Sequence, residues 1–313
     1  MSPLTFIFLR ILRRFPSSSP SNFLYAIFAF PVGKFAGEFY ELLIYRKMSL
    51  PRIHRKRGEL RIHETMDELK TDLVEYISEV SEASVKDRGC FAIALSSGSH
   101  IELLSKLSEV PYSKIVDWGK WNVFWADECL VAKRDADSNY KFAKDVFLSK
   151  VPLSSSQVRL INNSLKAEEA ASQYQFNMRQ QVKSRLINVS NLCDCPKFDL
   201  ILLEMGADGH IASLFPDHPA LAMTEDWVTF MNDSPIAPQQ RITFTLPVIN
   251  AASNVAVVVT GASKAEAAHL AIDDLAKGNV SLPARMVQPI EGKLVWFLDY
   301  PAGAKLDGVQ FSD

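Results

Sequence analysis

The chain has 313 residues, of which 48% are hydrophobic and 22% are charged, a balance typical of a globular protein. A formal net charge of −2 provides no overall basic surface, so we expect no nucleic-acid partner, and any anion must be bound locally. The four cysteines lack the paired C-x-x-C spacing of a structural zinc site. A chain of this length needs no disulfides, which favours a reducing compartment.

Residues 1–47 differ in composition from the rest of the chain. They include a serine cluster and four basic residues ahead of the first acid, Glu38; these are Arg10, Arg13, Arg14 and Lys34. This composition resembles a transit peptide, and we expect the protein in the chloroplast or the cytoplasm. The alternative is an extended leader upstream of Met48. The apolar run at 23–33 is too short to span a bilayer, so no stable membrane insertion is expected.

Helical and strand patterns alternate from about residue 60 onward, which favours one domain over residues 60–313. Apolar residues recur every three or four positions from Glu64 to Val80 and predict an amphipathic helix. Short apolar runs predict buried strands at 90–95, 121–126, 198–203, 255–260 and 294–298. This alternation predicts an α/β fold with a mainly parallel, Rossmann-like sheet and helices on both faces.

The segment Ser96, Ser97, Gly98 and Ser99 follows the first strand, at the edge where an open α/β sheet binds its ligands. It leads into an expected helix at 101–107. Small hydroxyl residues and glycine at a helix start expose N–H groups that can bind a phosphate, and the helix dipole adds attraction. A plain N-cap turn is the alternative. The segment has no Walker lysine, so a nucleotide loop is not expected.

Charged residues follow the second and fourth strands. Asp127 and Glu128 end the second strand at the same edge, although they could instead cap a helix or pair with surface cations. Ser138 is typical of the N-cap of the next helix. After the fourth strand, Lys264 is expected in the first turn of a helix, where the dipole disfavours a cation. A phosphate bound beside Lys264 would explain that position.

A histidine follows the third strand. His210 stands after Gly206, Asp208 and Gly209, in a turn at the end of an apolar run. A histidine there can titrate near neutral pH and reach a ligand. Although a lone histidine is more often structural, this context favours a general base.

The longest motif in the chain is D-G-H-x-A-S-L-F-P at 208–216, directly after the strand at 198–203. These segments resemble the signature of the 6-phosphogluconolactonases, and residues 121–139 and 241–247 resemble other parts of that family. The similarity spans residues 60–310 and is closest to the plant enzymes. It implies a fold related to glucosamine-6-phosphate deaminase, no metal or cofactor, and hydrolysis of 6-phospho-D-glucono-1,5-lactone in the oxidative pentose phosphate pathway.

The resemblance also assigns roles. His210 would activate water against the lactone carbonyl, and Asp208 would help to orient the loop. Phosphate contacts would fall on the 96–99 loop and on Lys264. The full set of expected substrate-binding residues is Ser96, Ser97, Gly98, Ser99, Asp127, Glu128, Lys264 and Arg241, of which Arg241 is the weaker candidate. The expected ligand is a small sugar phosphate lactone, bound by a monomer or homodimer.

Four residues depart from the family pattern around this crevice. Ser97 and Glu204 replace glycines, Cys129 replaces an arginine, and Ala207 replaces a proline. The Ser97 side chain is expected to crowd a phosphate, and Cys129 removes a permanent cation. The alternative function is therefore a catalytically weakened sugar-phosphate-binding homologue. An aminosugar deaminase or isomerase is disfavoured, because it needs a carboxylate five residues after the histidine, where Phe215 stands.

Overall fold

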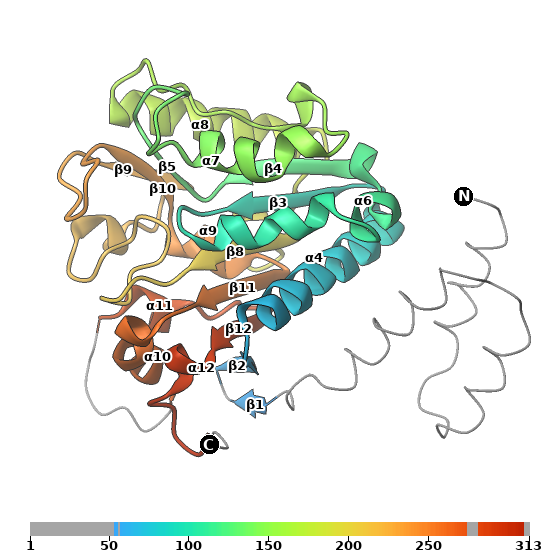
Figure 1. The fold of residues 1–313 in the computed structure, drawn as a ribbon. Helices are drawn as coiled ribbons and strands as arrows, with labels where there is room; N and C mark the ends of the chain where they lie inside the picture. Colours follow the sequence, from blue (N-terminus) through green and yellow to red (C-terminus); the bar gives the residue numbers. More distant parts are fainter. Residues whose placement is uncertain (1–52, 56, 274–280, 310–313) are drawn as a thin grey trace, which may run out of the picture. The chain divides into compact units, whose positions relative to one another are not determined.

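The computed structural model describes residues 53–55, 57–273 and 281–309, which belong to one compact unit, Leu50–Asp313 (Figure 1). The segment 1–47, expected to be a leader or transit segment, lies outside the described residues. The domain expected at 60–313 lies within this compact unit. The unit also includes a strand at Ile53–Arg55 and a strand at Gly58–His63, which begin before residue 60.

The core of this unit is a seven-stranded sheet in the order β1-β2-β12-β11-β8-β3-β4. Its strands are β1 (Ile53–Arg55), β2 (Gly58–His63), β3 (Phe91–Leu95), β4 (Trp121–Trp125), β8 (Leu200–Glu204), β11 (Asn254–Val259) and β12 (Lys293–Asp299). Every neighbouring pair from β2 to β4 is parallel, and only β1 pairs antiparallel, with β2. The expected α/β fold with a mainly parallel sheet is confirmed.

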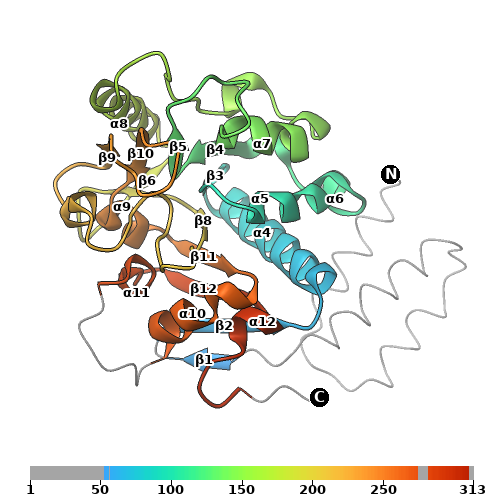
Figure 2. The ribbon, with the colours of Figure 1, turned by 60° about the vertical axis from the view of Figure 1, so that its left-hand side comes forward.

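Helices cover both faces of the sheet. In Figure 2, α4 and α5 lie on one side of the sheet, and α8 and α9 lie on the other. The α-helices are α4 (Met66–Arg88), α5 (His100–Leu103), α6 (Tyr112–Ile115), α7 (Asn139–Val146), α8 (Ala167–Lys183), α9 (Leu246–Ala251), α10 (Ala265–Ile272), α11 (Pro283–Met286) and α12 (Tyr300–Gly303). Outside the main sheet, β5 (Asp127–Cys129), β10 (Arg241–Phe244) and β9 (Val228–Met231) form a second sheet, and β6 (Asn188–Val189) pairs with β7 (Pro196–Lys197).

Local sequence explains where α4 begins and ends. Thr65 and Glu68 form a capping box that satisfies the free N–H groups of the first turn. The helix ends at Gly89, whose φ of +79° is in the left-handed region that glycine favours. The expected helix at 64–80 is therefore present and continues for two more turns. No helix in the described ranges is long and apolar enough to cross a membrane.

The position of the site follows from the strand order. Along the chain, β3 leads to its neighbour β4 on one side, whereas β8 leads to its neighbour β11 on the other. The chain thus reverses direction across the sheet between β3 and β8, and open α/β sheets bind ligands at such a point. The strands that flank it are packed into the core, since all five residues of β3 and four of the five residues of β8 are buried.

Candidate active site

His210 lies in the loop after β8, and Asp208 holds its ring. His210 Nδ1 lies 2.5 Å from Asp208 Oδ1, which also accepts the backbone N–H of His210 at 3.1 Å. Because an ionised carboxylate can only accept, Nδ1 of the neutral ring carries the proton and Nε2 carries the lone pair. Nε2 has no hydrogen-bond partner among the described residues, and the side chain is 19% exposed. Nε2 is therefore available as a proton acceptor.

Glycines allow the loop to pack this closely beneath the imidazole. A Cβ on Gly206 would lie 2.2 Å from His210 Nδ1 and Cε1, so a larger residue would displace the ring. Gly209 has a φ of +81°, and a Cβ there would lie 2.3 Å from Leu282 Cδ2. The Phe215 ring lies 4.6 Å from the His210 ring, centroid to centroid. The turn thus fixes the position of the imidazole.

Asp127 connects two of the expected site loops. Its Oδ1 accepts the Ser97 N–H at 2.8 Å, and its Oδ2 accepts the hydroxyls of Ser97 at 2.9 Å and Ser213 at 2.7 Å. Hydrogen bonds to a charged oxygen are strong, and they offset the cost of burying the carboxylate. The Ser97 side chain, expected to crowd a phosphate, is turned to Asp127 instead. Asp127 therefore holds the loop after β3 against the loop after β8.

Glu128 is turned toward the start of α7. Its oxygens accept hydrogen bonds from the N–H groups of Asn139, Tyr140 and Cys129 and from the Ser138 hydroxyl, at 2.7–3.4 Å. Burial raises the pKa of Glu128 to about 7, although the backbone N–H groups act in the opposite direction. Ser138 caps α7 as expected. These contacts give Glu128 a structural task, and its role as a substrate ligand stays a prediction that they do not support.

Glu204, the last residue of β8, lies among the groups expected to bind a phosphate. Its carboxylate accepts the Ser99 hydroxyl at 3.1 Å, the His100 N–H at 2.9 Å and His100 Nδ1 at 3.3 Å. Lys264, in the 3₁₀ turn Ala262–Lys264 before α10, forms an ion pair with the same carboxylate. A Cβ on Gly98 would lie 2.3 Å from Glu204 Oε2, so the loop passes directly over the carboxylate.

The surroundings of Glu204 favour its charged form. Burial alone would raise its pKa, but hydrogen bonds and charges from His100 and Lys264 outweigh burial and hold the pKa below the ordinary range. Ser96 fixes the backbone beside it, because the buried Ser96 hydroxyl accepts the Glu204 N–H at 3.1 Å and donates to Ser97 O at 3.1 Å. Ser96 therefore positions the loop, and its hydroxyl is already in use.

Arg241, in β10, reaches the same region from the second sheet. Its Nη1 lies 3.5 Å from Ser213 Oγ, and its other guanidinium nitrogens donate to the carbonyls of residues 236–238 at 2.8–3.1 Å. Its Cζ lies 6.0 Å from the Phe215 ring centroid. Nearby, burial raises the pKa of the Cys129 thiol to about 12, so the thiol is neutral at physiological pH.

Hydrogen bonds and ion pairs among the described residues divide the expected residues into the His210–Asp208 pair and two larger groups. One joins Ser97, Asp127 and Arg241 through Ser213, and the other joins Ser99 and Lys264 through Glu204. Three participants escaped the sequence analysis as site residues: Ser213, Thr243 and His100. Ser213 lies within the 208–216 motif and His100 follows the 96–99 loop, so proximity could have suggested both. Thr243, which accepts the Ser213 N–H at 3.2 Å, lies two residues after Arg241 in the 241–247 segment, so proximity could have suggested it as well.

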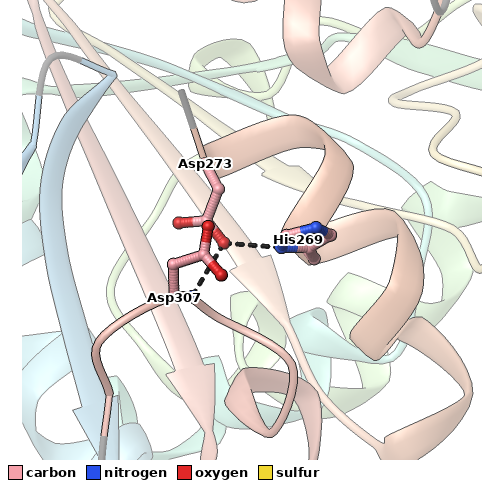
Figure 3. Close-up of side chains that lie close together, drawn as sticks. All are labelled: His269, Asp273 and Asp307. Carbon is pink, nitrogen blue, oxygen red and sulfur yellow. Dashed lines mark hydrogen bonds and ion pairs between the residues drawn. The ribbon is translucent and has the colours of Figure 1, made fainter. Parts of the chain in front are cut away.

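A possible metal-binding group lies at the C-terminal end of α10, the helix that begins directly after Lys264. Among the described residues, His269, Asp273 and Asp307 are the one set of three whose potential ligand atoms lie within 4.8 Å of one another (Figure 3). Asp273 Oδ2 accepts the Asp307 N–H at 3.0 Å and lies 2.7 Å from His269 Nδ1. These contacts connect the end of α10 to the C-terminal loop, and they explain the cluster without a metal.

Comparison with known proteins relates most of the described region to one family. The family model for glucosamine-6-phosphate isomerases and 6-phosphogluconolactonases matches residues 64–296. A probable 6-phosphogluconolactonase 1 of Arabidopsis thaliana is 58% identical over 268 residues, which are 85% of this chain and 100% of the relative. A probable chloroplastic 6-phosphogluconolactonase 3 of Oryza sativa subsp. indica is 46% identical over 250 residues, covering 80% of this chain and 76% of the relative.

A solved structure supports the same relationship. The 6-phosphogluconolactonase of Trypanosoma brucei superimposes with a TM-score of 0.68 at 27% identity, covering 79% of this chain and 98% of that protein. The resemblance inferred from the 208–216 motif is confirmed. The chain belongs to the family of glucosamine-6-phosphate isomerases and 6-phosphogluconolactonases.

Proposed function

We propose that this chain hydrolyses 6-phospho-D-glucono-1,5-lactone to 6-phospho-D-gluconate, a step of the oxidative pentose phosphate pathway. The observation that carries the proposal is the His210–Asp208 pair, which leaves Nε2 as a free base at the switch point of the sheet. The substrate is inferred from the names of the relatives.

The chemistry needs one proton acceptor that later becomes a donor. His210 Nε2 takes a proton from water as the water oxygen attacks C1 of the lactone. When the bond between C1 and the ring oxygen breaks, the imidazolium returns that proton to the ring oxygen. Asp208 stabilises the imidazolium in between through Nδ1–H. Water is consumed, and the product is an acid with an opened ring.

The phosphate of the substrate is assigned to the 96–99 loop and Lys264. Lys264 supplies a cation, and Ser99 supplies a hydroxyl that is already directed at an anion, the Glu204 carboxylate. The same observation favours a second candidate function, a catalytically weakened sugar-phosphate-binding homologue. The groups assigned to the phosphate already have a charged partner, which a substrate would have to displace.

A lactonase assay on the full-length protein tests the proposal, with spontaneous lactone hydrolysis subtracted. Wild type should accelerate hydrolysis, and His210→Ala should lose about 10²–10⁴-fold in kcat, the usual effect of removing a positioned acid-base group. His218→Gln is a matched control, because His218 also pairs with an aspartate, Asp233, but serves a surface turn. Full turnover in the His210 variant would disprove the assignment, and an inactive wild type would favour the second candidate.

Compartment and assembly are separate parts of the proposal. Some relatives are named chloroplastic, whereas the Arabidopsis relative is not. We infer a chloroplast or cytoplasmic location, depending on whether residues 1–47 act as a transit segment. A fluorescent protein fused after residue 47 of the chain would distinguish the two locations. Light scattering of the purified protein would distinguish a monomer from a homodimer.

A further inference from the structure

Four donors that could bind a substrate phosphate are directed at one side chain of the protein itself. The Glu204 carboxylate accepts the Ser99 hydroxyl, the His100 N–H and His100 Nδ1, and it forms an ion pair with Lys264. The side chains of Glu204 and Lys264 are each only 13% exposed. A charged pair so shielded from water is weakly screened, and it resists separation.

A phosphate would have to compete with the carboxylate for these donors, because the Ser99 hydroxyl and the His100 N–H each have one hydrogen and the charge of Lys264 is already paired. The Gly98 backbone lies so close to Glu204 Oε2 that a Cβ would be 2.3 Å from it, which leaves no space for a second anion at that point. If the carboxylate moved aside, it would remain tied to the end of β8, and its negative charge would still face the incoming phosphate. Like charges at such distances weaken binding strongly.

We propose that Glu204 is a specificity-determining residue whose carboxylate competes with the substrate phosphate for the 96–100 segment and Lys264. This inference deepens the proposed function, rests on its assignment of the phosphate to the 96–99 loop and Lys264, and adds the neighbouring His100 to the donors that the carboxylate occupies. The consequence is a shift in preference: the chain binds phosphorylated sugar acids and lactones more weakly than its fold permits. Ligands without a phosphate are unaffected, because they do not need these donors.

The carboxylate could instead have a structural role, in which it holds Lys264 and the 96–99 loop in the arrangement that binds phosphate. The two roles predict opposite effects when the charge is removed. A competitor, once neutralised, releases its donors and tightens phosphate binding. If the carboxylate has the structural role, its neutralisation loosens the loop and weakens phosphate binding. Measured affinity for a phosphorylated ligand therefore decides between them.

The experiment compares full-length wild type with Glu204→Gln and Glu204→Gly by isothermal titration calorimetry. The probes are 6-phosphogluconate and gluconate, which differ only in the phosphate. Glu102→Gln is the matched control, because Glu102 is exposed on α5 and its removal changes the net charge equally. Thermal melting shows whether each variant folds. If Glu204→Gln does not fold, the comparison is made with Glu204→Gly.

We expect the Glu204 variants to bind 6-phosphogluconate about 10- to 100-fold more tightly, the range for removing one adjacent like charge. Gluconate binding and the Glu102→Gln control should not change. Unchanged or weaker 6-phosphogluconate binding would overturn the inference. An equal gain for both probes would also overturn it, because it would indicate a wider crevice rather than competition for phosphate.

Lactonase assays on the same proteins separate this inference from the proposed function. If no variant hydrolyses the lactone but phosphate binding tightens as expected, the proposed function fails and the role of Glu204 stands. If wild type hydrolyses the lactone and the Glu204 variants bind 6-phosphogluconate no better, the role of Glu204 fails and the proposed function stands.

Discussion

Arg241 lies directly opposite Cys129 in the antiparallel pairing of β10 with β5. A permanent cation therefore remains beside the position at which the family pattern has an arginine. Its charge is present, but most of its donors are occupied, because the carbonyls of residues 236–238 accept three of its hydrogen bonds. Arg241 can thus replace part of the missing electrostatic effect but little of the missing hydrogen bonding.

The contact between Asp208 and His210 predicts a specific kinetic defect. Asp208→Asn keeps the size of the side chain but no longer stabilises an imidazolium or selects the Nδ1–H tautomer. We expect kcat to fall at least about 10-fold, because an aspartate-to-asparagine change beside a catalytic histidine can cost up to about 10⁴-fold. KM and the melting temperature should change little, since the Asp208 side chain is 47% exposed. Steady-state kinetics across pH would measure this, and a defect confined to KM would contradict it.

The contribution of Lys264 to phosphate binding should depend on whether its ammonium group is paired with Glu204. In wild type its ammonium is paired with Glu204, so Lys264→Ala should weaken 6-phosphogluconate binding only modestly. In a Glu204→Gly background the same substitution should cost at least about tenfold more. Calorimetry on the four proteins completes the cycle, with gluconate as the ligand that lacks the phosphate. Equal losses on both ligands would show that Lys264 does not contact the phosphate.

Much of the fold could be predicted because buried parallel strands have a local signature. The five apolar runs correspond to β3, β4, β8, β11 and β12. Strand β2 was missed, because its sequence, Gly-Glu-Leu-Arg-Ile-His, alternates and has no continuous apolar run. The helix expected at 101–107 is also shorter, since α5 ends at Leu103 and a 3₁₀ turn, Leu104–Ser108, continues it.

The candidate site was only partly predictable, for a physical reason. The rule that ligands meet strand ends located His210, Asp127 and Lys264, because it depends on chain order alone. The partner that each side chain takes depends on tertiary packing. Glu128 reaches the N–H groups of α7 eleven and twelve residues along the chain, and Glu204 meets Lys264 sixty residues away. Nothing in local sequence distinguishes such a partner from a substrate.

Glu128 predicts a pH dependence of stability. Its pKa rises from 4.5 to about 7 on folding, so the folded state favours the protonated form more than the unfolded state does. The stabilisation from this group is complete below pH 4.5 and is lost as the pH rises through about 7. The free energy of unfolding of wild type should therefore fall relative to Glu128→Gln between about pH 5 and pH 8. Urea unfolding at several pH values measures it, and parallel curves for both proteins would contradict it.

The last prediction concerns the thiol at position 129. Losing one group that stabilises developing negative charge commonly costs about 10²–10³-fold in rate. Because Arg241 stands opposite and most of its donors are engaged, it should recover only part of that loss, so wild type should be a slow lactonase. Cys129→Arg should raise kcat about tenfold or more, provided that the buried position accepts the larger side chain, which thermal melting will show. Cys129→Ala is the control, because it removes the thiol without adding charge and should leave kcat unchanged. An efficient wild type with no gain from the arginine would show that position 129 is dispensable for stabilising the developing negative charge.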